Sequence, residues 1–122
     1  MSAPADITLV LSEPPSANAI WRNVVIGRSA RTLKSKPYRD WLTKAADEVA
    51  QQSAADRLDG PYSLRITVPK QKRRDLANNE KALSDLLQAA GVVRDDLNCV
   101  RLTMVRDPAR EPGRVLVELW AA

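Results

Sequence analysis

Residues 73–96, RRDLANNEKALSDLLQAAGVVRDD, place one short amphipathic helix between carboxylates and a basic run. The helix is expected to end at Gly91, because glycine commonly follows the last turn of a helix. Asp75 precedes it, and Asp95 and Asp96 follow it. Carboxylates flanked by cations suggest metal-assisted chemistry on a phosphate backbone. The apolar side chains expected to form the buried stripe of this helix are Leu76, Leu83, Leu86, Leu87 and Ala90.

Strands are predicted on both sides of this helix. Residues 62–68 alternate apolar and polar side chains before Pro69, which predicts a half-buried strand. Residues 100–105 and 115–120 predict two further strands, joined by the turn-rich linker DPAREPGR. Because these two strands follow one another directly, we expect them to pair as an antiparallel hairpin.

The N-terminal half adds a strand, a hairpin and a helix. Residues 7–12 predict a strand that ends before the Pro14-Pro15 turn. Residues 21–34 suit a strand or ragged hairpin around Gly27, and residues 37–57 have the apolar spacing of an amphipathic helix. The aromatic side chains of that helix lie on its apolar stripe, so we expect them in the core. Together these elements predict an α+β fold, with a small mixed or antiparallel sheet backed by two helices in a single domain, residues 1–122.

The composition excludes several kinds of site. The chain has no histidine, which excludes imidazole bases, Ser-His triads and histidine metal ligands. Cys99 is the only cysteine, and a buried thiol is a better interpretation than a nucleophile that lacks a histidine partner. What remains for hydrolysis is Asp, Glu, Lys, Tyr and a hard metal ion held by oxygen ligands.

The charge of the chain favours anionic partners, and the N-terminus has no obvious targeting segment. The net charge is +4 and the pI about 9.6, values that also suit an ordinary soluble protein. The first 16 residues lack a charged leader followed by a long apolar run, so we expect a cytoplasmic protein.

Each charged group also has an ordinary structural explanation. Asp75 can cap a helix, and Asp95-Asp96 can make a turn. Lys81 shares a helix face with Ala77, but it can instead form an ion pair with Asp85. The cations of residues 21–34 form a candidate DNA-facing stripe, and a solvated hairpin edge explains them about as well. Composition and spacing alone therefore support a nucleic-acid-binding domain with a weak indication of a metal site.

Two segments resemble the RusA family of Holliday junction resolvases, small endodeoxyribonucleases often carried by phages and prophages. The first is ITLVLSEPPSANAIWR, which is similar to the family's strand and PPSxN loop and includes Asn18. The second is RRDLANNEKALSDLLQAAGVVRDD, which is similar to the family motif RDxDNxxK followed by a downstream DD. The resemblance extends to the central helix and the C-terminal strands and so covers nearly the whole chain.

The resemblance implies an active site of three aspartates that bind magnesium, together with a lysine. Asp75 matches the first aspartate, Asn78 the asparagine, Lys81 the lysine and Asp96 the downstream aspartate, with Asp95 as its acidic neighbour and alternative ligand. Ala77 stands where the family has its second aspartate, and a methyl group cannot coordinate a cation. A deliberate Asp-to-Ala change is favoured by the intact remainder of the motif. The alternative is a divergent natural member that uses Glu80 or Asp95 as a substitute.

The implied function is a magnesium-dependent, structure-selective endonuclease that resolves four-way DNA junctions by paired symmetric nicks in recombination and repair. Manganese is a plausible substitute for magnesium. Ala77 implies that this form is impaired or inactive, and the alternative is a non-catalytic junction-binding or nucleic-acid-binding protein of the same fold. The cations expected to contact DNA phosphates are Arg22, Arg28, Arg31, Lys34, Lys70, Lys72, Arg73 and Arg74.

Geometry and symmetry add two expectations. A helix over residues 76–90 is about 22 Å long, which puts Asp75 and Asp96 at opposite ends unless residues 91–95 double back. Either the helix begins later, near Asn79, or a neighbouring subunit completes the site. We expect a homodimer, because two coordinated cuts and a four-way junction both match two-fold symmetry.

Overall fold

The computed structural model describes residues 3–16, 21–26, 29–52, 57–71 and 76–122, and within residues 21–34 it describes the backbone only. Neither α2 nor any other helix in these ranges combines the length and apolar character that a membrane span needs. The elements in chain order are β1 (Ile7–Ser12), β2 (Trp21–Ile26), β3 (Ser29–Lys34), α2 (Lys36–Gln52), β4 (Tyr62–Val68), the 3-10 turn η1 (Leu76–Asn79), α3 (Glu80–Ala89), the 3-10 turn η2 (Asp96–Asn98), β5 (Cys99–Arg106) and β6 (Arg114–Ala121).

Four strands form one mixed sheet in the order β1-β6-β4-β5. β6 is antiparallel to both β1 and β4, whereas β4 and β5 are parallel. The α+β prediction is therefore confirmed, but the predicted hairpin between the last two strands is wrong, because β4 lies between them. The linker of residues 107–113 is long enough for this arrangement, since crossing one intervening strand requires only about 10 Å.

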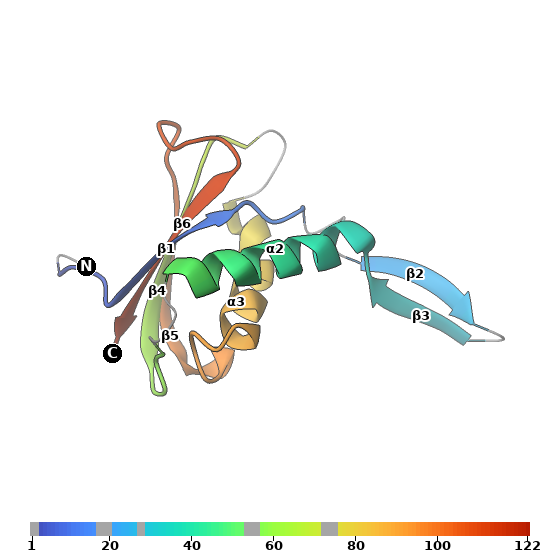
Figure 1. Cartoon of the computed structure of the whole chain (residues 1–122), viewed down its shortest axis with the longest axis horizontal. Coiled ribbons are helices and arrows are strands. Elements are labelled where there is room, and N and C mark those ends of the chain that lie inside the picture. The colour runs from blue at the N-terminus through green and yellow to red at the C-terminus, as the bar shows by residue number, and fades with distance from the viewer. Residues whose placement is uncertain (1–2, 17–20, 27–28, 53–56, 72–75) are drawn as a thin grey trace.

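The core lies between this sheet and the two helices, which cover the same face of the sheet (Figure 1). In β4 the fully buried Leu64 and Ile66 alternate with the half-exposed Ser63 and Arg65, as the period of a strand requires. Tyr38 and Trp41 of α2 are also buried and pack tilted with ring centroids 5.8 Å apart, which confirms the predicted core role of these aromatics.

The boundaries of α2 differ from the prediction at one end. The Ser35 hydroxyl accepts a hydrogen bond from the N–H of Tyr38, and Pro37 suits the first turn, so the helix begins as expected. The described helix ends at Gln52 rather than at residue 57: residues 53–56 lie outside the described ranges, and Arg57 is not helical. Apolar periodicity fixes the buried face of a helix more firmly than its last turn.

β2 and β3 confirm the predicted hairpin. They pair antiparallel from Trp21↔Lys34 to Ile26↔Ser29, and the ribbon projects away from the sheet and helices (Figure 1). Arg28 lies outside the described residues, as do the side chains of Arg22, Arg31 and Lys34. The predicted DNA-facing stripe on this hairpin therefore stays a prediction.

Polar side chains fasten α2 to the edge strand β1. The carboxylate of Glu48 accepts hydrogen bonds from the N–H and hydroxyl of Ser12 and pairs with Arg114 of β6 at 2.6 Å. The amide of Gln52 bonds both the N–H and the carbonyl of Val10 at 2.8 and 2.7 Å. Gln52 thus occupies backbone groups on the free edge of β1, which would otherwise be open to another strand.

Removing the Glu48 carboxylate is expected to destabilise the fold in a pH-dependent way. Burial raises the pKa of Glu48, but hydrogen bonds from Ser12 and Arg114 outweigh it and hold the pKa below its ordinary value. A depressed pKa in the folded state stabilises the protein above the unfolded-state pKa, and this contribution is lost as the pH falls through the folded-state pKa. Glu48→Gln should therefore cost about 1–3 kcal/mol at neutral pH and progressively less below about pH 4.

Urea unfolding of both proteins across this pH range measures the difference. Asp40→Asn is the matched control, since Asp40 pairs with Lys36 at 2.7 Å on the exposed face of the same helix. Such an exposed pair contributes little, so this change should be nearly neutral. A Glu48→Gln difference that stays constant down to acid pH would contradict the proposed electrostatic origin.

Candidate functional site

The connection between β4 and β5, residues 69–98, contains every position of the predicted active-site motif. Parallel neighbours need such a crossover, because the chain must return along the sheet before the second strand begins. Asp75, Lys72, Arg73 and Arg74 lie outside the described residues, so their predicted roles stay predictions. The described part of the crossover runs from η1 through α3 to η2.

The start of α3 lies later than the amphipathic pattern alone suggests. The 3-10 turn Leu76–Asn79 precedes the α-helix, which begins at Glu80 and continues to Ala89. This matches the expectation of a helix that begins near Asn79. Gly91 follows the helix with φ +77°, a conformation that favours glycine, which confirms the predicted stop. The leucine side chains at 83, 86 and 87 are buried as predicted.

The segment after α3 turns back and packs against Leu58 and the last turn of the helix. The backbone of Leu58 bonds Val92 and Arg94, and an isolated bridge joins Leu58 to Val93. The N–H of Asp96 then donates to the side-chain oxygen of Gln88 at 2.9 Å, so Asp96 lies against the helix. The Asp95 carboxylate accepts a hydrogen bond from the N–H of Leu97 at 2.9 Å and caps η2. Asp95 therefore has the turn-forming role that was its simpler explanation.

Lys81 has two kinds of acidic neighbour. Its ammonium lies 3.2 Å from the Asp85 carboxylate, which is the ordinary i,i+4 pair expected on an exposed helix face. Hydrogen bonding and charge from Asp85 raise the pKa of Lys81 most, and the charges of Asp96 and Glu80 raise it further. Asp96 thus lies near enough to Lys81 for its charge to act on the lysine, and the predicted shared role of the two residues in an active site stays a prediction.

Tyr62 at the start of β4 is a member of this region that sequence reasoning missed. Its side chain is 1% exposed, and its hydroxyl has no hydrogen-bond partner among the described residues. Burial raises the pKa of Tyr62 to about 12, with added contributions from Cys99, Asp96, Glu80 and Asp95. The strand pattern marked Tyr62 only as apolar, and nothing local to it signals the acidic surroundings.

The lone thiol behaves as predicted. Cys99 is free and half-buried, opposite Tyr62 in the β4–β5 register. Burial raises its pKa, which keeps the thiol protonated and a poor nucleophile at neutral pH.

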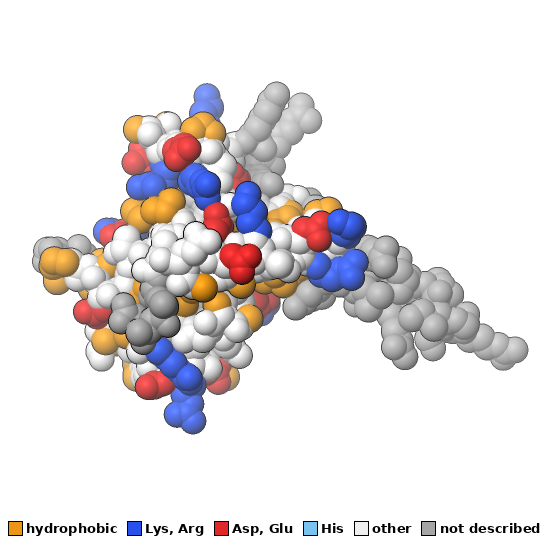
Figure 2. All heavy atoms as spheres, viewed as in Figure 1, with side chains coloured by type: hydrophobic (Ala, Val, Ile, Leu, Met, Phe, Trp, Pro, Cys, Tyr) orange, Lys and Arg blue, Asp and Glu red, His pale blue; other side chains and the backbone are white. Residues whose placement is uncertain are grey.

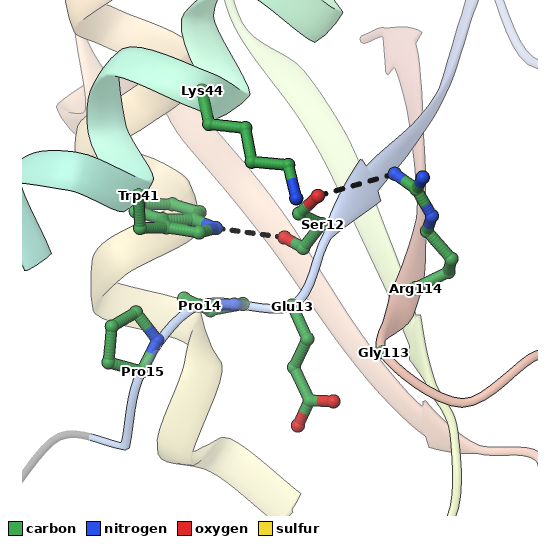
Figure 3. Close-up of a pocket in the computed structure, with 8 residues that line it drawn as sticks. All are labelled: Ser12, Glu13, Pro14, Pro15, Trp41, Lys44, Gly113 and Arg114. Carbon is green, nitrogen blue, oxygen red and sulfur yellow. Dashed lines mark hydrogen bonds between the residues drawn. The ribbon is translucent and has the colours of Figure 1, made fainter. Parts of the chain in front are cut away.

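A pocket of about 480 Å³ lies where β1 runs into the double-proline turn. In Figure 3 the Trp41 indole donates to the carbonyl of Ser12, while Lys44 and Arg114 approach from opposite sides. The side chain of Gln71 donates a hydrogen bond to Glu13, which connects this turn to the residue just before the basic run, Lys72 to Arg74. Asn18 of the predicted loop motif lies outside the described residues.

Comparison with known proteins identifies the family. The model of the family described as endodeoxyribonuclease RusA matches residues 12–120. The chain belongs to the RusA family. A crossover junction endodeoxyribonuclease RusA from Shigella sonnei is 32% identical over 111 residues, which cover 88% of each chain. A protein of the same name from Enterobacteria phage 82 is 33% identical over 110 residues, which again cover 88% of each chain. Another, from Aquifex aeolicus, is 28% identical over 93 residues, which cover 75% of this chain and 72% of the relative.

Membership of the RusA family raises the question of whether the described acidic residues could bind magnesium. Carboxylate oxygens are suitable ligands for a hard cation, and the protonated Cys99 thiol is not. Within the described ranges, however, no three acidic, cysteine or histidine side chains converge closely enough to hold a metal ion. Ala77 is exposed and contributes only a methyl group. Carboxylates are therefore the right kind of ligand for the magnesium site that the family resemblance implies. A site of three carboxylates would need ligands beyond the described residues.

The unpartnered hydroxyl of Tyr62 yields a stability prediction. Tyr62→Phe should leave stability at neutral pH unchanged or slightly higher, since no hydrogen bond is lost. The raised folded-state pKa stabilises the protein below about pH 10, and this contribution is lost as the pH rises towards about 12. The wild type should thus lose about 1.4 kcal/mol per pH unit relative to the variant in that interval.

Denaturant unfolding of both proteins at about pH 8 and pH 11 measures this difference. A loss of more than about 1 kcal/mol in the variant at the lower pH would show that the hydroxyl does have a partner.

Proposed function

We propose that this RusA-family chain is a structure-selective endonuclease for four-way DNA junctions, built to cut two opposing strands symmetrically with magnesium. The supporting observation is that one crossover carries Lys81 and Asp96 near enough for the charge of Asp96 to raise the pKa of Lys81. The names of the bacterial and phage relatives, crossover junction endodeoxyribonucleases, supply the substrate and the reaction. Such a substrate would place the protein in the cytoplasm of a bacterial host cell.

The roles follow from the charges of the residues. Asp75 and Asp96, with Asp95 as a neighbour already engaged in a cap, would hold magnesium or manganese. When bound, the cation would supply Lewis-acid polarisation of the scissile phosphate and activation of water. Lys81 would stabilise negative charge that develops on the phosphate. In the free protein Lys81 forms an ion pair with Asp85. A DNA phosphate would have to replace Asp85 as the partner of Lys81, and such an exposed pair is weak.

Ala77 supports the further proposal that this form cuts poorly. A deleted carboxylate removes both a ligand and a negative charge from a hard-cation site. Glu80 is the substitute best placed along the chain, because it begins α3 three residues after Ala77, about one helical turn away. One of its oxygens already accepts a hydrogen bond from the Ser84 hydroxyl at 2.8 Å. The alternative function, junction binding without cleavage, is favoured by the missing carboxylate alone.

Restoring the carboxylate tests catalysis. Ala77→Asp should raise magnesium-dependent cleavage of a synthetic four-way junction by about tenfold or more, because it returns a ligand next to Asp75 and Lys81. Asp96→Asn in the restored protein is the control and should abolish the gain. Equal, low cleavage by the wild type and Ala77→Asp would contradict the proposal, and a fully active wild type would show that the second carboxylate is dispensable.

DNA contacts are proposed to come from the basic run and the hairpin. Of the eight cations predicted to contact phosphates, Lys70 is the one whose side chain is described, and it is exposed. Figure 2 shows acidic and basic side chains interspersed over α2, so the outer face of this helix does not offer a uniform basic surface. Binding should depend on phosphate contacts and weaken with salt.

We propose a homodimer because one edge of the sheet is covered and the other is open, and because the hairpin projects from the domain. Gln52 occupies the edge of β1, whereas β5 pairs only with β4 in the described sheet. Leu97, Val100 and Leu102 lie in η2 and β5 and are 87%, 62% and 43% exposed. An open strand edge with exposed apolar side chains favours pairing with another chain. The projecting β2–β3 ribbon also suits a partner, because an isolated two-stranded hairpin is marginally stable.

Sedimentation at micromolar concentration tests the assembly. The wild type should sediment as a dimer, and Val100→Glu combined with Leu102→Glu should shift it to monomer by adding like charges at the open edge. Val10→Glu is the matched control, because Val10 is similarly apolar and 38% exposed but lies on the edge that Gln52 occupies. A stable wild-type monomer would count against the dimer, and equal effects of both changes would count against the β5 edge.

A further inference from the structure

The most exposed large apolar side chain in the described ranges lies directly beside the candidate site. Leu97 is 87% exposed, and Val100 follows it at 62%. Leu97 comes immediately after Asp96 in η2, before β5 begins at Cys99. Single exposed leucines are common on protein surfaces, so exposure alone gives Leu97 no role. Its neighbour in the chain and the way its turn is held are the observations that give it one.

Hydrogen bonds on both sides of Leu97 hold η2 against the rest of the protein. The N–H of Leu97 itself donates to the Asp95 carboxylate at 2.9 Å, and the N–H of Asn98 donates to the Asp95 carbonyl at 3.1 Å. The N–H of Asp96 donates to the side-chain oxygen of Gln88 in α3 at 2.9 Å. The backbone of this turn is therefore ordered before any ligand binds, which lowers the entropy cost of using its side chains for binding.

The position of Leu97 relative to Asp96 decides which part of a DNA substrate it can reach. Consecutive Cα atoms lie about 3.8 Å apart, and adjacent side chains of a 3-10 turn point about 120° apart. Successive nucleotides of one strand rise about 3.4 Å along a duplex. If Asp96 holds a cation at the scissile phosphate, Leu97 points away from that phosphate and is within reach of a sugar or base about one or two nucleotides from the cut.

We propose that Leu97 recognises the branch point of a four-way junction by covering the face of a base that lacks a stacking neighbour there. Bases inside a continuous duplex are stacked on both faces, whereas bases beside an opened branch point have one face free. Leucine is among the apolar side chains that insert between bases in proteins that unstack DNA. It carries no charge and no hydrogen-bonding group, so it adds selectivity for shape without reading the base. The inference rests on the proposed function, which supplies both the substrate and the role of Asp96.

Leu97 also lies near the open edge of β5, where the homodimer is proposed to form. Pairing along that edge uses the strand itself, Cys99–Arg106, and Leu97 precedes it. Val100 and Leu102 would therefore remain available to a partner subunit while Leu97 contacts DNA. The two roles differ in what removal of the Leu97 side chain does to assembly.

Binding of a four-way junction and of a duplex with the same arm sequence tests the inference. Leu97→Ala should weaken junction binding about fivefold and leave duplex binding unchanged, because only the junction offers a free base face. Leu97→Phe should keep the preference for the junction, since a phenyl ring also covers a base. Val10→Ala is the matched control and should change neither affinity, because Val10 is an exposed apolar residue of β1 at the other edge of the sheet.

Two further measurements separate base contact from assembly. A fluorescent adenine analogue that brightens when it is unstacked, placed at the branch point, should brighten more with the wild type than with Leu97→Ala, and sedimentation of the two proteins should be the same. Wild-type junction preference and brightening in Leu97→Ala would overturn the inference alone. A shift of Leu97→Ala to a smaller species would also overturn it, by giving the side chain to the partner subunit. A wild type that binds the junction no better than the duplex would instead contradict the proposed function, and the inference with it.

Discussion

The parallel pairing of β4 with β5 is the constraint on which the rest of the molecule depends. Antiparallel neighbours can be joined by a tight turn, but parallel neighbours require the chain to travel back along the sheet. Residues 69–98 make that return, and the same residues carry the basic run, η1, α3 and η2. The family motif is therefore held on a connection that the sheet needs in any case, and Asp96 reaches α3 because η2 must come back to begin β5.

Packing of α2 gives the sheet two different edges. Glu48 and Gln52 bond the backbone of β1, and Trp41 donates to the carbonyl of Ser12, so this edge is closed by side chains of the helix. At the opposite edge β5 exposes apolar side chains and is open to a partner. The proposed homodimer would use this open edge, and two copies that met there through the same surface would be related by a two-fold axis.

The charged residues around α3 make more interactions within the protein than the motif suggests. Lys81 already has Asp85, Asp95 already caps η2, and Tyr62 keeps a buried hydroxyl near several negative groups. The active-site roles of Lys81 and Asp96 come from the family motif and stay predictions. The turn-forming role of Asp95 was also open to prediction, since its partner Leu97 is two residues away. The acidic surroundings of Tyr62 were not, because they join β4 to η2, which lies more than 30 residues later in the chain.

Most elements and their buried faces could be predicted from the chain, because the period of apolar side chains is a local property of helices and strands. The strand at 62–68, the stop at Gly91 and the exclusion of histidine chemistry follow from local residues, whereas residues 21–34 suited either a strand or a ragged hairpin. Only the tertiary structure decided that β4 separates β5 from β6, and that Leu97 is exposed beside Asp96. A linker of seven residues permits either strand order, so the choice rests on how the whole core packs rather than on any local signal.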